Sequence, residues 1–247
     1  MYLLFHDVYA CDPRESGFVS PAADRYKLTV RQFERQMAWL AQTPGPPFEL
    51  TFDDGGSSFY SQIADRLESR GWRAHCFVPT DYIGRPGFLT RQEIRELDER
   101  GHRIGSHSAS HPMRFHANSR DVIADEWSRS LAVLQDLLGH AVHTASVPGG
   151  FYSRTVAELA AAAGVTELFT SEPVARSHRV GPCEVVGRFT IRRSSDECLA
   201  ARLVSPAPWA RWAMWVEWNA KAVIKPVLGP FYSQMADWLM AGNAAER

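Results

Sequence analysis

Short apolar runs alternate along this 247-residue chain with longer segments in which apolar residues recur every three or four positions. The short runs are expected to be strands and the longer segments amphipathic helices. Strands joined by crossover helices form a mainly parallel sheet, so the pattern predicts an α/β fold. Seven strands are expected, at residues 2–8, 48–52, 74–78, 103–105, 142–147, 167–170 and 184–191.

The expected helices carry capping signals at their ends. Thr29 with Gln32, and Thr90 with Glu93, form the pattern in which a hydroxyl and a carboxylate or amide side chain cap the first turn. Glycine readily adopts the left-handed conformation found after a helix, so Gly139 is expected to end one. Helices are predicted at residues 30–41, 58–69, directly after Thr90, 119–138 and 154–163, and a loop between the last two strands.

The composition excludes several classes of protein. With 45% hydrophobic residues the chain can bury a full core, and its length fits one barrel-like domain. The 27 basic and 28 acidic residues give a net charge of −1, so no bulk charge attracts nucleic acid. The first five residues lead at once into His6 and Asp7, unlike a secretory signal, and no window has the roughly 20 apolar residues of a membrane span. A cytoplasmic location is therefore expected.

The first segment with candidate chemistry is residues 50–56, an apolar strand that runs into Asp53, Asp54 and two glycines. In α/β barrels, catalytic groups lie at such strand ends. Adjacent side chains there point in different directions, so one carboxylate is free to bind a metal while the other faces substrate. The alternative is a turn in which Asp53 caps a helix and Gly55 takes a positive φ.

The second segment, residues 101–112, is again a short strand followed by polar residues, with His107 and His111 four positions apart. On a single helical turn this spacing puts both imidazoles on one side, within reach of a common ion. Pro112 ends that turn. A pair of histidines without a third ligand is often not a metal site. The two carboxylates after the earlier strand supply such a ligand and so favour metal binding by this pair.

Together, residues 51–55 (Thr-Phe-Asp-Asp-Gly) and 107–112 (His-Ser-Ala-Ser-His-Pro) resemble the first two signatures of the polysaccharide deacetylases, the family with the NodB homology domain, also called carbohydrate esterase family 4. Residues 4–8 and 28–37 also resemble the start of many members. The resemblance implies a deformed, seven-stranded, TIM-like (β/α) barrel at residues 1–204. It also implies one divalent ion, usually zinc, with cobalt, nickel or manganese as alternatives. Asp54, His107 and His111 would bind the ion, and Asp53 would be the general base.

The family's third signature begins with an arginine that orients the base, and here Ser146 stands in its place. Something else must therefore hold Asp53. Pro148 of the signature is present, and the N–H of Gly149 is a candidate donor to the oxyanion. The alternative is a simple Pro-Gly-Gly loop.

The family's last signature, which carries the general acid, has no clear match. Arg188 and the pair Arg192-Arg193 occupy that region. Two histidines are candidates for the acid: His6, at the end of the first strand, and His178, in the last loop. Of the two, His6 lies within a family-like segment.

Residues 205–247 are expected to be a tryptophan-rich helical extension packed on the barrel. Trp209, Trp212 and Val216 fall on one apolar stripe, and Pro226 and Gly229 interrupt the helix before a last short segment. Packing of that stripe would leave Trp215 and Trp218 partly exposed. The alternative is a helix that touches a membrane carrying a lipid-linked sugar, with Arg211, Lys221 and Lys225 along its other side.

These observations predict a hydrolase that removes an N-acyl group, with acetyl the expected one, from an amino sugar of a glycan, a glycolipid or a sugar-containing metabolite. An N-acylated sugar is the expected partner, and nucleic acid is not. One alternative is a deformylase or another C–N hydrolase acting on a non-polymeric substrate. The other is a metal-binding member without catalysis, suggested by Ser146 and the missing acid.

Overall fold

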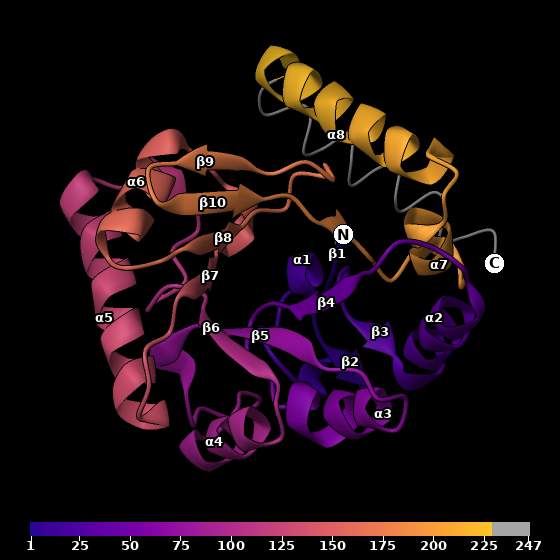
Figure 1. Ribbon diagram of the computed structural model, residues 1–247, viewed down its shortest axis with the longest axis horizontal. Helices are drawn as coiled ribbons and strands as arrows, with labels where there is room; N and C mark the ends of the chain where they lie inside the picture. Colours follow the sequence, from indigo (N-terminus) through magenta and orange to yellow (C-terminus); the bar gives the residue numbers. More distant parts are fainter. Residues whose placement is uncertain (229–247) are drawn as a thin grey trace.

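A curled, mainly parallel sheet with helices on its outer side forms the body of the protein (Figure 1). The structure is a computed structural model that describes residues 1–228. The sheet has nine strands in the order β11-β1-β4-β5-β6-β7-β8-β10-β9, and β9 is the antiparallel one. The strands are β1 (Tyr2–Phe5), β4 (Glu49–Phe52), β5 (Ala74–Val78), β6 (Arg103–Ser106), β7 (Thr144–Ser146), β8 (Glu167–Phe169), β9 (His178–Val180), β10 (Cys183–Val186) and β11 (Phe189–Thr190).

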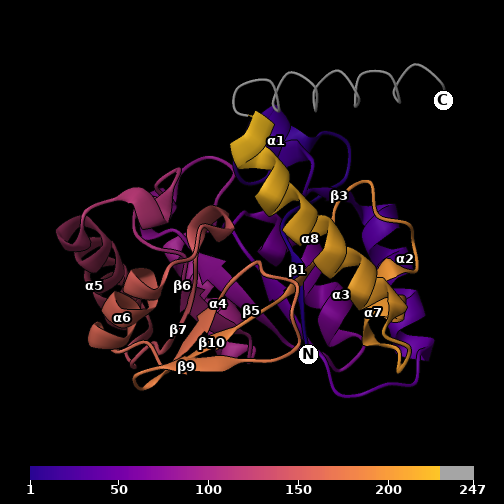
Figure 2. The same cartoon turned by 90° about the horizontal axis from the view of Figure 1, so that it is seen from above.

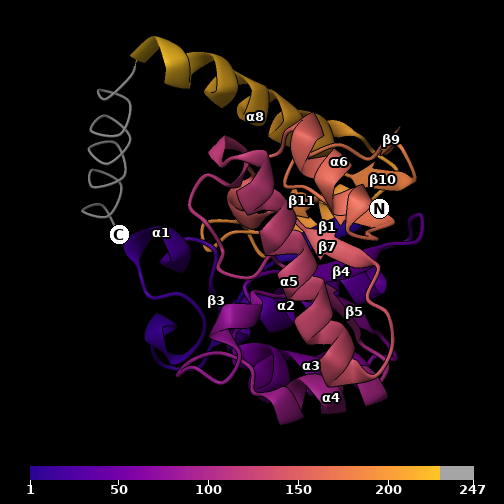
Figure 3. The ribbon, with the colours of Figure 1, turned by 90° about the vertical axis from the view of Figure 1, so that its left-hand side faces the viewer.

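The helices lie on the outside of the sheet, and Figure 3 looks onto α5 and α6. The predicted capping pairs are present, since Thr29 and Gln32 cap α2 and Thr90 and Glu93 cap α4. The predicted helix at 58–69 begins with a π-turn, η2 (Phe59–Ile63). The longer helices are α2 (Val30–Gln42), α3 (Ala64–Glu68), α4 (Arg91–Glu99), α5 (Arg120–Leu138), α6 (Arg154–Ala162), α7 (Leu199–Val204) and α8 (Trp209–Leu228).

Short elements follow the carboxyl ends of several parallel strands. β2 (Val8–Tyr9) and β3 (Leu28–Thr29) form a separate two-stranded sheet. The remaining short helices are η1 (Pro13–Glu15), α1 (Pro21–Asp24), η3 (Thr80–Tyr82), η4 (Phe115–Ala117) and η5 (Pro148–Gly150).

All seven predicted strands are found, but the first and the last differ from the prediction, and β9 lies where a loop was predicted. The predicted strand at 2–8 ends at Phe5, and Val8 pairs with Leu28 in the separate sheet. The apolar run at 184–191 is two strands, β10 and β11, separated by Gly187 and Arg188. A Cβ at Gly187 would lie 2.5 Å from the Val174 carbonyl oxygen, so only glycine fits at this close approach. The Arg188 N–H donates to the Glu172 carbonyl at 2.9 Å. This break turns the Arg188 side chain into the barrel.

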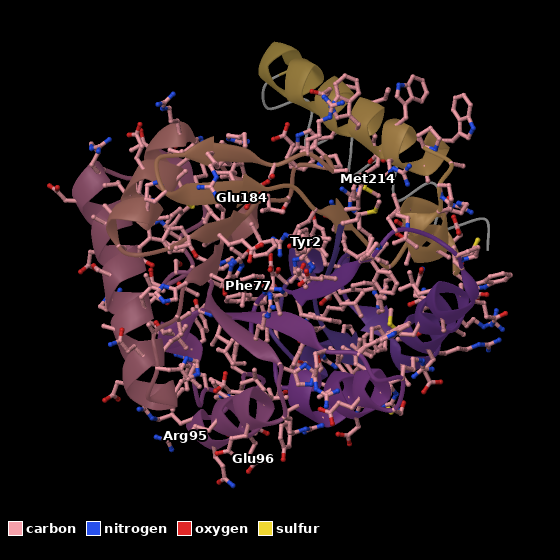
Figure 4. All side chains as sticks on the ribbon, in the orientation of Figure 1. Tyr2, Phe77, Arg95, Glu96, Glu184 and Met214 are labelled. Carbon is pink, nitrogen blue, oxygen red and sulfur yellow. The ribbon has the colours of Figure 1, made fainter. Side chains whose placement is uncertain are left out.

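Most of the core fills the space between the sheet and the helices, and a second, smaller cluster lies inside the curl of the sheet. Phe77, Phe169 and Val186 form this inner cluster, with Tyr2 packed against it. Figure 4 shows Tyr2 and Phe77 in the interior, whereas Arg95 and Glu96 of α4 lie on the outside. The inner side of the sheet therefore has aromatic walls.

The C-terminal helix α8 lies on the outside of the molecule and begins next to α7 (Figure 2). Its predicted apolar stripe faces solvent, because Trp209, Trp212 and Val216 are 73%, 60% and 38% exposed. Contrary to the expected packing of that stripe, the contacts with the core come from Ala210 and Met214. No helix in the described part of the chain is long and apolar enough to cross a bilayer. The short segment predicted after Gly229 lies outside the described residues.

Candidate active site

Two carboxylates follow β4 at its carboxyl end. The Asp53 N–H donates to the Phe5 carbonyl at 3.1 Å, which extends the pairing of β4 with β1 by one residue. Asp54 and Gly55 then take φ of 75° and 60°, so the chain turns in the left-handed region. The turn sends the two side chains in different directions. Asp54 faces His107, and Asp53 faces Arg188, so Asp53 does not act as a helix cap.

The second ligand segment is a loop and not the predicted helical turn. His107 follows β6, and Ser108 and His111 both adopt left-handed backbone angles, with φ of 61° and 56°. This path brings the two imidazole centroids to 4.9 Å from each other. The Nε2 atoms of His107 and His111 lie 3.4 and 3.6 Å from Asp54 Oδ1.

These separations suit a metal ion. Ligand atoms held at about 2.0–2.2 Å by a tetrahedral zinc ion are roughly 3.4 Å apart. The three ligand atoms of Asp54, His107 and His111 all lie within 4.8 Å of one another. His107 Nδ1 faces the Ser146 carbonyl oxygen at 2.9 Å, so a proton on Nδ1 leaves Nε2 free for the ion. The structure thus brings the predicted triad together from two strand ends.

Charges within the site set the protonation of the ligands. Burial alone would raise the pKa of Asp54, but hydrogen bonding to His107 and the neighbouring imidazole charges lower it. Burial would lower the pKa of His107, yet the charges of Asp53 and Asp54 raise it. Burial and the charge of His107 lower the pKa of His111 to about 4. At neutral pH Asp54 is therefore ionised and His111 is neutral, which are the forms in which these side chains bind a metal ion.

The partner of Asp53 is Arg188, a residue that the sequence did not single out for this role. The Arg188 Nη1 and Nη2 atoms donate to the two Asp53 carboxylate oxygens at 2.7 and 2.8 Å, in the bidentate geometry that arginine favours. Arg188 also donates to Thr51 Oγ1 and to the Thr170 carbonyl, and its side chain is fully buried. The rings of Phe77 and Phe169 lie 5.6 and 5.7 Å from its guanidinium carbon.

Ser146 completes the surroundings of Asp53. Its hydroxyl donates to Asp53 Oδ2 at 3.0 Å and accepts from Arg188 Nη2 at 2.8 Å. Burial alone would raise the pKa of Asp53, but the charges of Arg188 and His107 hold it below its usual value. The carboxylate is thus kept ionised although it is almost completely buried. The cation that the family's signature has at position 146 is supplied here by Arg188, from the connection between β10 and β11.

His6 lies on the same rim as the two carboxylates. It follows β1, whose Phe5 is paired with Phe52, so His6 stands opposite Asp53 on the neighbouring strand. The ring packs against Tyr26 at 4.8 Å, and Nδ1 is buried with no hydrogen-bond partner in the described residues.

The other predicted site residues lie after β7 and on β9. His178 is exposed on the edge strand β9, where Nε2 contacts the Tyr152 hydroxyl at 3.2 Å. Pro148 is buried two residues after the end of β7, and Gly149 is exposed with φ of 61°. Gly149 therefore lies on the rim that carries Ser146, whereas His178 lies at the edge of the sheet.

Comparisons of sequence agree with this geometry. The sequence model described as Polysaccharide deacetylase matches residues 41–168, about half of the chain. The chain therefore belongs to the polysaccharide deacetylase family. YxkH of Bacillus subtilis, which carries the family's name, is 26% identical over 175 residues, 63% of this chain and 62% of YxkH. Peptidoglycan-N-acetylglucosamine deacetylase PgdA of Listeria monocytogenes is 35% identical over 111 residues, 44% of this chain and 22% of PgdA. The chain thus spans less than two thirds of these relatives.

Comparison of structures supports the same fold. The Streptococcus pyogenes deacetylase PplD, solved in complex with acetate, has a TM-score of 0.68 and 19% identity, over 83% of this chain and 97% of PplD. The predicted deformed barrel and the predicted family are confirmed. The family match also supports the predicted class of enzyme, a hydrolase acting on a carbon–nitrogen bond.

Proposed function

We propose that the chain hydrolyses the amide of an N-acetylated amino sugar, with one divalent metal ion held by Asp54, His107 and His111. One observation carries the proposal: three candidate ligand atoms within 4.8 Å of one another lie beside a buried carboxylate, Asp53, that an arginine holds by two hydrogen bonds. A peptidoglycan-N-acetylglucosamine deacetylase among the relatives supports an amino-sugar substrate.

The donor set fits zinc. Two imidazoles and one carboxylate leave room for water and substrate, which is the arrangement of catalytic rather than structural sites. When bound, the ion would lower the pKa of a water molecule and polarise the amide carbonyl. A site without sulfur ligands also suits cobalt, nickel or manganese.

Side chains and backbone groups of the chain carry out the proton transfers and stabilise the oxyanion. Asp53 takes the proton of the attacking water, and its lowered pKa keeps it ionised throughout the physiological pH range. Arg188 and Ser146 together donate three hydrogen bonds to this carboxylate, so its orientation is fixed before substrate arrives. The Gly149 N–H is the proposed donor to the developing oxyanion. His6 is the proposed acid that protonates the leaving amine.

The test is a release assay. The metal-loaded protein is incubated with free, polymeric and lipid-linked N-acyl sugars, and the released acid is identified by mass spectrometry. Acetate released by the wild type and lost in Asp53→Asn of equal metal content supports the proposal. Formate in place of acetate identifies a deformylase. A metal-loaded protein that releases no acid from any substrate contradicts the proposal and favours a non-catalytic metal-binding protein.

A further inference from the structure

In the loop from Ser106 to His111, two residues have unfavourable backbone angles. Among the described residues, three that are not glycine have positive φ, namely Asp54, Ser108 and His111. Two of the three are proposed ligands. Such angles cost energy in residues with a Cβ and persist only where the surroundings impose them. Asp54 is followed by Gly55, which eases its turn, but the loop between Ser106 and His111 contains no glycine.

A buried carboxylate on α5 accepts hydrogen bonds from this loop. Glu126 is 4% exposed, and its Oε2 accepts hydrogen bonds from the N–H groups of Ala109 and Ser110 at 2.9 and 2.8 Å. Its Oε1 accepts from the Ser110 hydroxyl at 2.6 Å, and Arg129 lies 3.4 Å from the same oxygen. Two successive N–H groups that converge on one anion form the concave backbone arrangement in which anions bind.

The rest of the loop is held by other groups. The N–H groups of Thr80 and Asp81 donate to the Ser108 and Ala109 carbonyls at 3.2 and 2.9 Å. The Ser108 hydroxyl accepts from the His111 N–H at 3.1 Å. Glu126 therefore accepts from the two N–H groups between Ser108 and His111, where the backbone bends most.

The two histidines depend on the loop to different degrees. His107 is fixed to its surroundings directly, because its N–H donates to the Val78 carbonyl and its ring contacts the Ser146 carbonyl. The backbone of His111 is held by the turn that precedes it, through the Ser108 hydroxyl, and its ring packs against Phe18 at 4.7 Å. A change in that turn should move His111 and leave His107 and Asp53 in place.

We propose that Glu126 is a positioning residue that holds the 108–111 turn in the shape in which His111 can bind metal. The inference rests on the proposed metal site. Without the carboxylate, the two N–H groups lose their acceptors, the turn relaxes and the third ligand is no longer preorganised. Removal of a partner that orients a ligand weakens metal binding by about 10–100-fold.

The test measures metal affinity and not turnover. Zinc affinity is determined by competition with a chromophoric chelator for wild type, Glu126→Gln, Glu126→Ala and Asp125→Asn. Asp125 is the matched control, because it precedes Glu126 on α5 but is largely exposed. Affinity should fall by about 10–100-fold in Glu126→Ala and by less in Glu126→Gln, whose amide oxygen still accepts a hydrogen bond. Asp125→Asn should bind zinc as the wild type does. Cobalt loaded at saturation should give an altered visible spectrum in Glu126→Ala.

Three results would overturn the inference: wild-type affinity in a folded Glu126→Ala, equal weakening in Asp125→Asn, or, if Glu126→Ala does not fold, wild-type affinity in Glu126→Gln. The equal weakening would point to a general loss of negative charge. A wild-type protein that takes up no zinc or cobalt would instead refute the metal site itself, so the two failures are distinguishable.

Discussion

The two sides of the site are built in different ways. The metal-binding side comes from two short continuous segments, at the ends of β4 and β6. The side that holds Asp53 comes from single residues, Ser146 and Arg188, which are 93 and 135 positions away in sequence. Neighbouring parallel strands end at one rim, so a few adjacent residues suffice to surround an ion. The cation that neutralises the buried carboxylate comes from the connection between β10 and β11, far from Asp53 in the sequence, so the environment of the base depends on the whole fold.

The largest expected effects separate metal binding from turnover. His107→Ala removes one of three ligands and should weaken metal binding by more than the roughly 100-fold that the loss of an orienting partner causes, and turnover should be lost with the metal.

Asp53→Asn should retain the metal and lose turnover by roughly 10²–10⁴-fold, as expected for a general base. Elemental analysis and the acid-release assay measure the two quantities. Equal metal loss in Asp53→Asn and Asp54→Asn would show that the two carboxylates do not divide the work in this way.

A smaller effect, of roughly 10²-fold, is expected for the proposed acid. His6→Ala should reduce turnover by that amount while the metal content stays unchanged, because the ring lies on the rim beside Asp53 but outside the triad. His178→Ala, at the edge strand, is the matched control and should be neutral. A neutral His6→Ala would leave His178 or solvent as the proton donor. An experimental structure with His6 more than about 8 Å from the metal, too far even for one bridging water, would exclude it as well.

The contrast between the two sides also explains what could be predicted from the sequence. Asp53, Asp54, His107 and His111 stand in continuous motifs at strand ends, and the strand pattern placed those ends on one rim. Arg188 stands in an apolar run that predicted one uninterrupted strand, and the break at Gly187 depends on the close approach of Val174. A contact between distant segments leaves no periodic signal. The stripe on α8 shows the same limit, because periodicity defines a face but not the neighbour it meets.

The base-holding side predicts a change in pH dependence. Arg188→Met leaves Asp53 buried without its cation, so its pKa should rise and the acidic limb of the activity profile should move to higher pH. Stability should fall by about 3–5 kcal/mol, as for other broken buried ion pairs. Arg188→Lys keeps the charge but loses the bidentate geometry, so its limb should move less and turnover at neutral pH should fall by only about 10-fold. An unchanged acidic limb in a folded Arg188→Met would show that Asp53 does not set it.

The smallest effect on turnover is expected from α8, which lies outside both sides of the site. Its exposed stripe consists of Trp209, Trp212 and Val216, none of which is charged. Indole rings favour the interface between lipid and water. We therefore propose that this stripe binds a lipid surface. The double variant Trp209→Ser and Trp212→Ser should keep wild-type turnover on a soluble N-acetylated sugar but bind less to phospholipid vesicles in a sedimentation assay. Trp39→Ser, on α2 and 50% exposed in the wild type, is the matched control and should bind vesicles unchanged. Binding to zwitterionic and anionic vesicles should be similar, because the stripe itself carries no charge. A wild-type protein that sediments with neither kind of vesicle, or a Trp39→Ser variant that loses binding equally, would contradict the proposal.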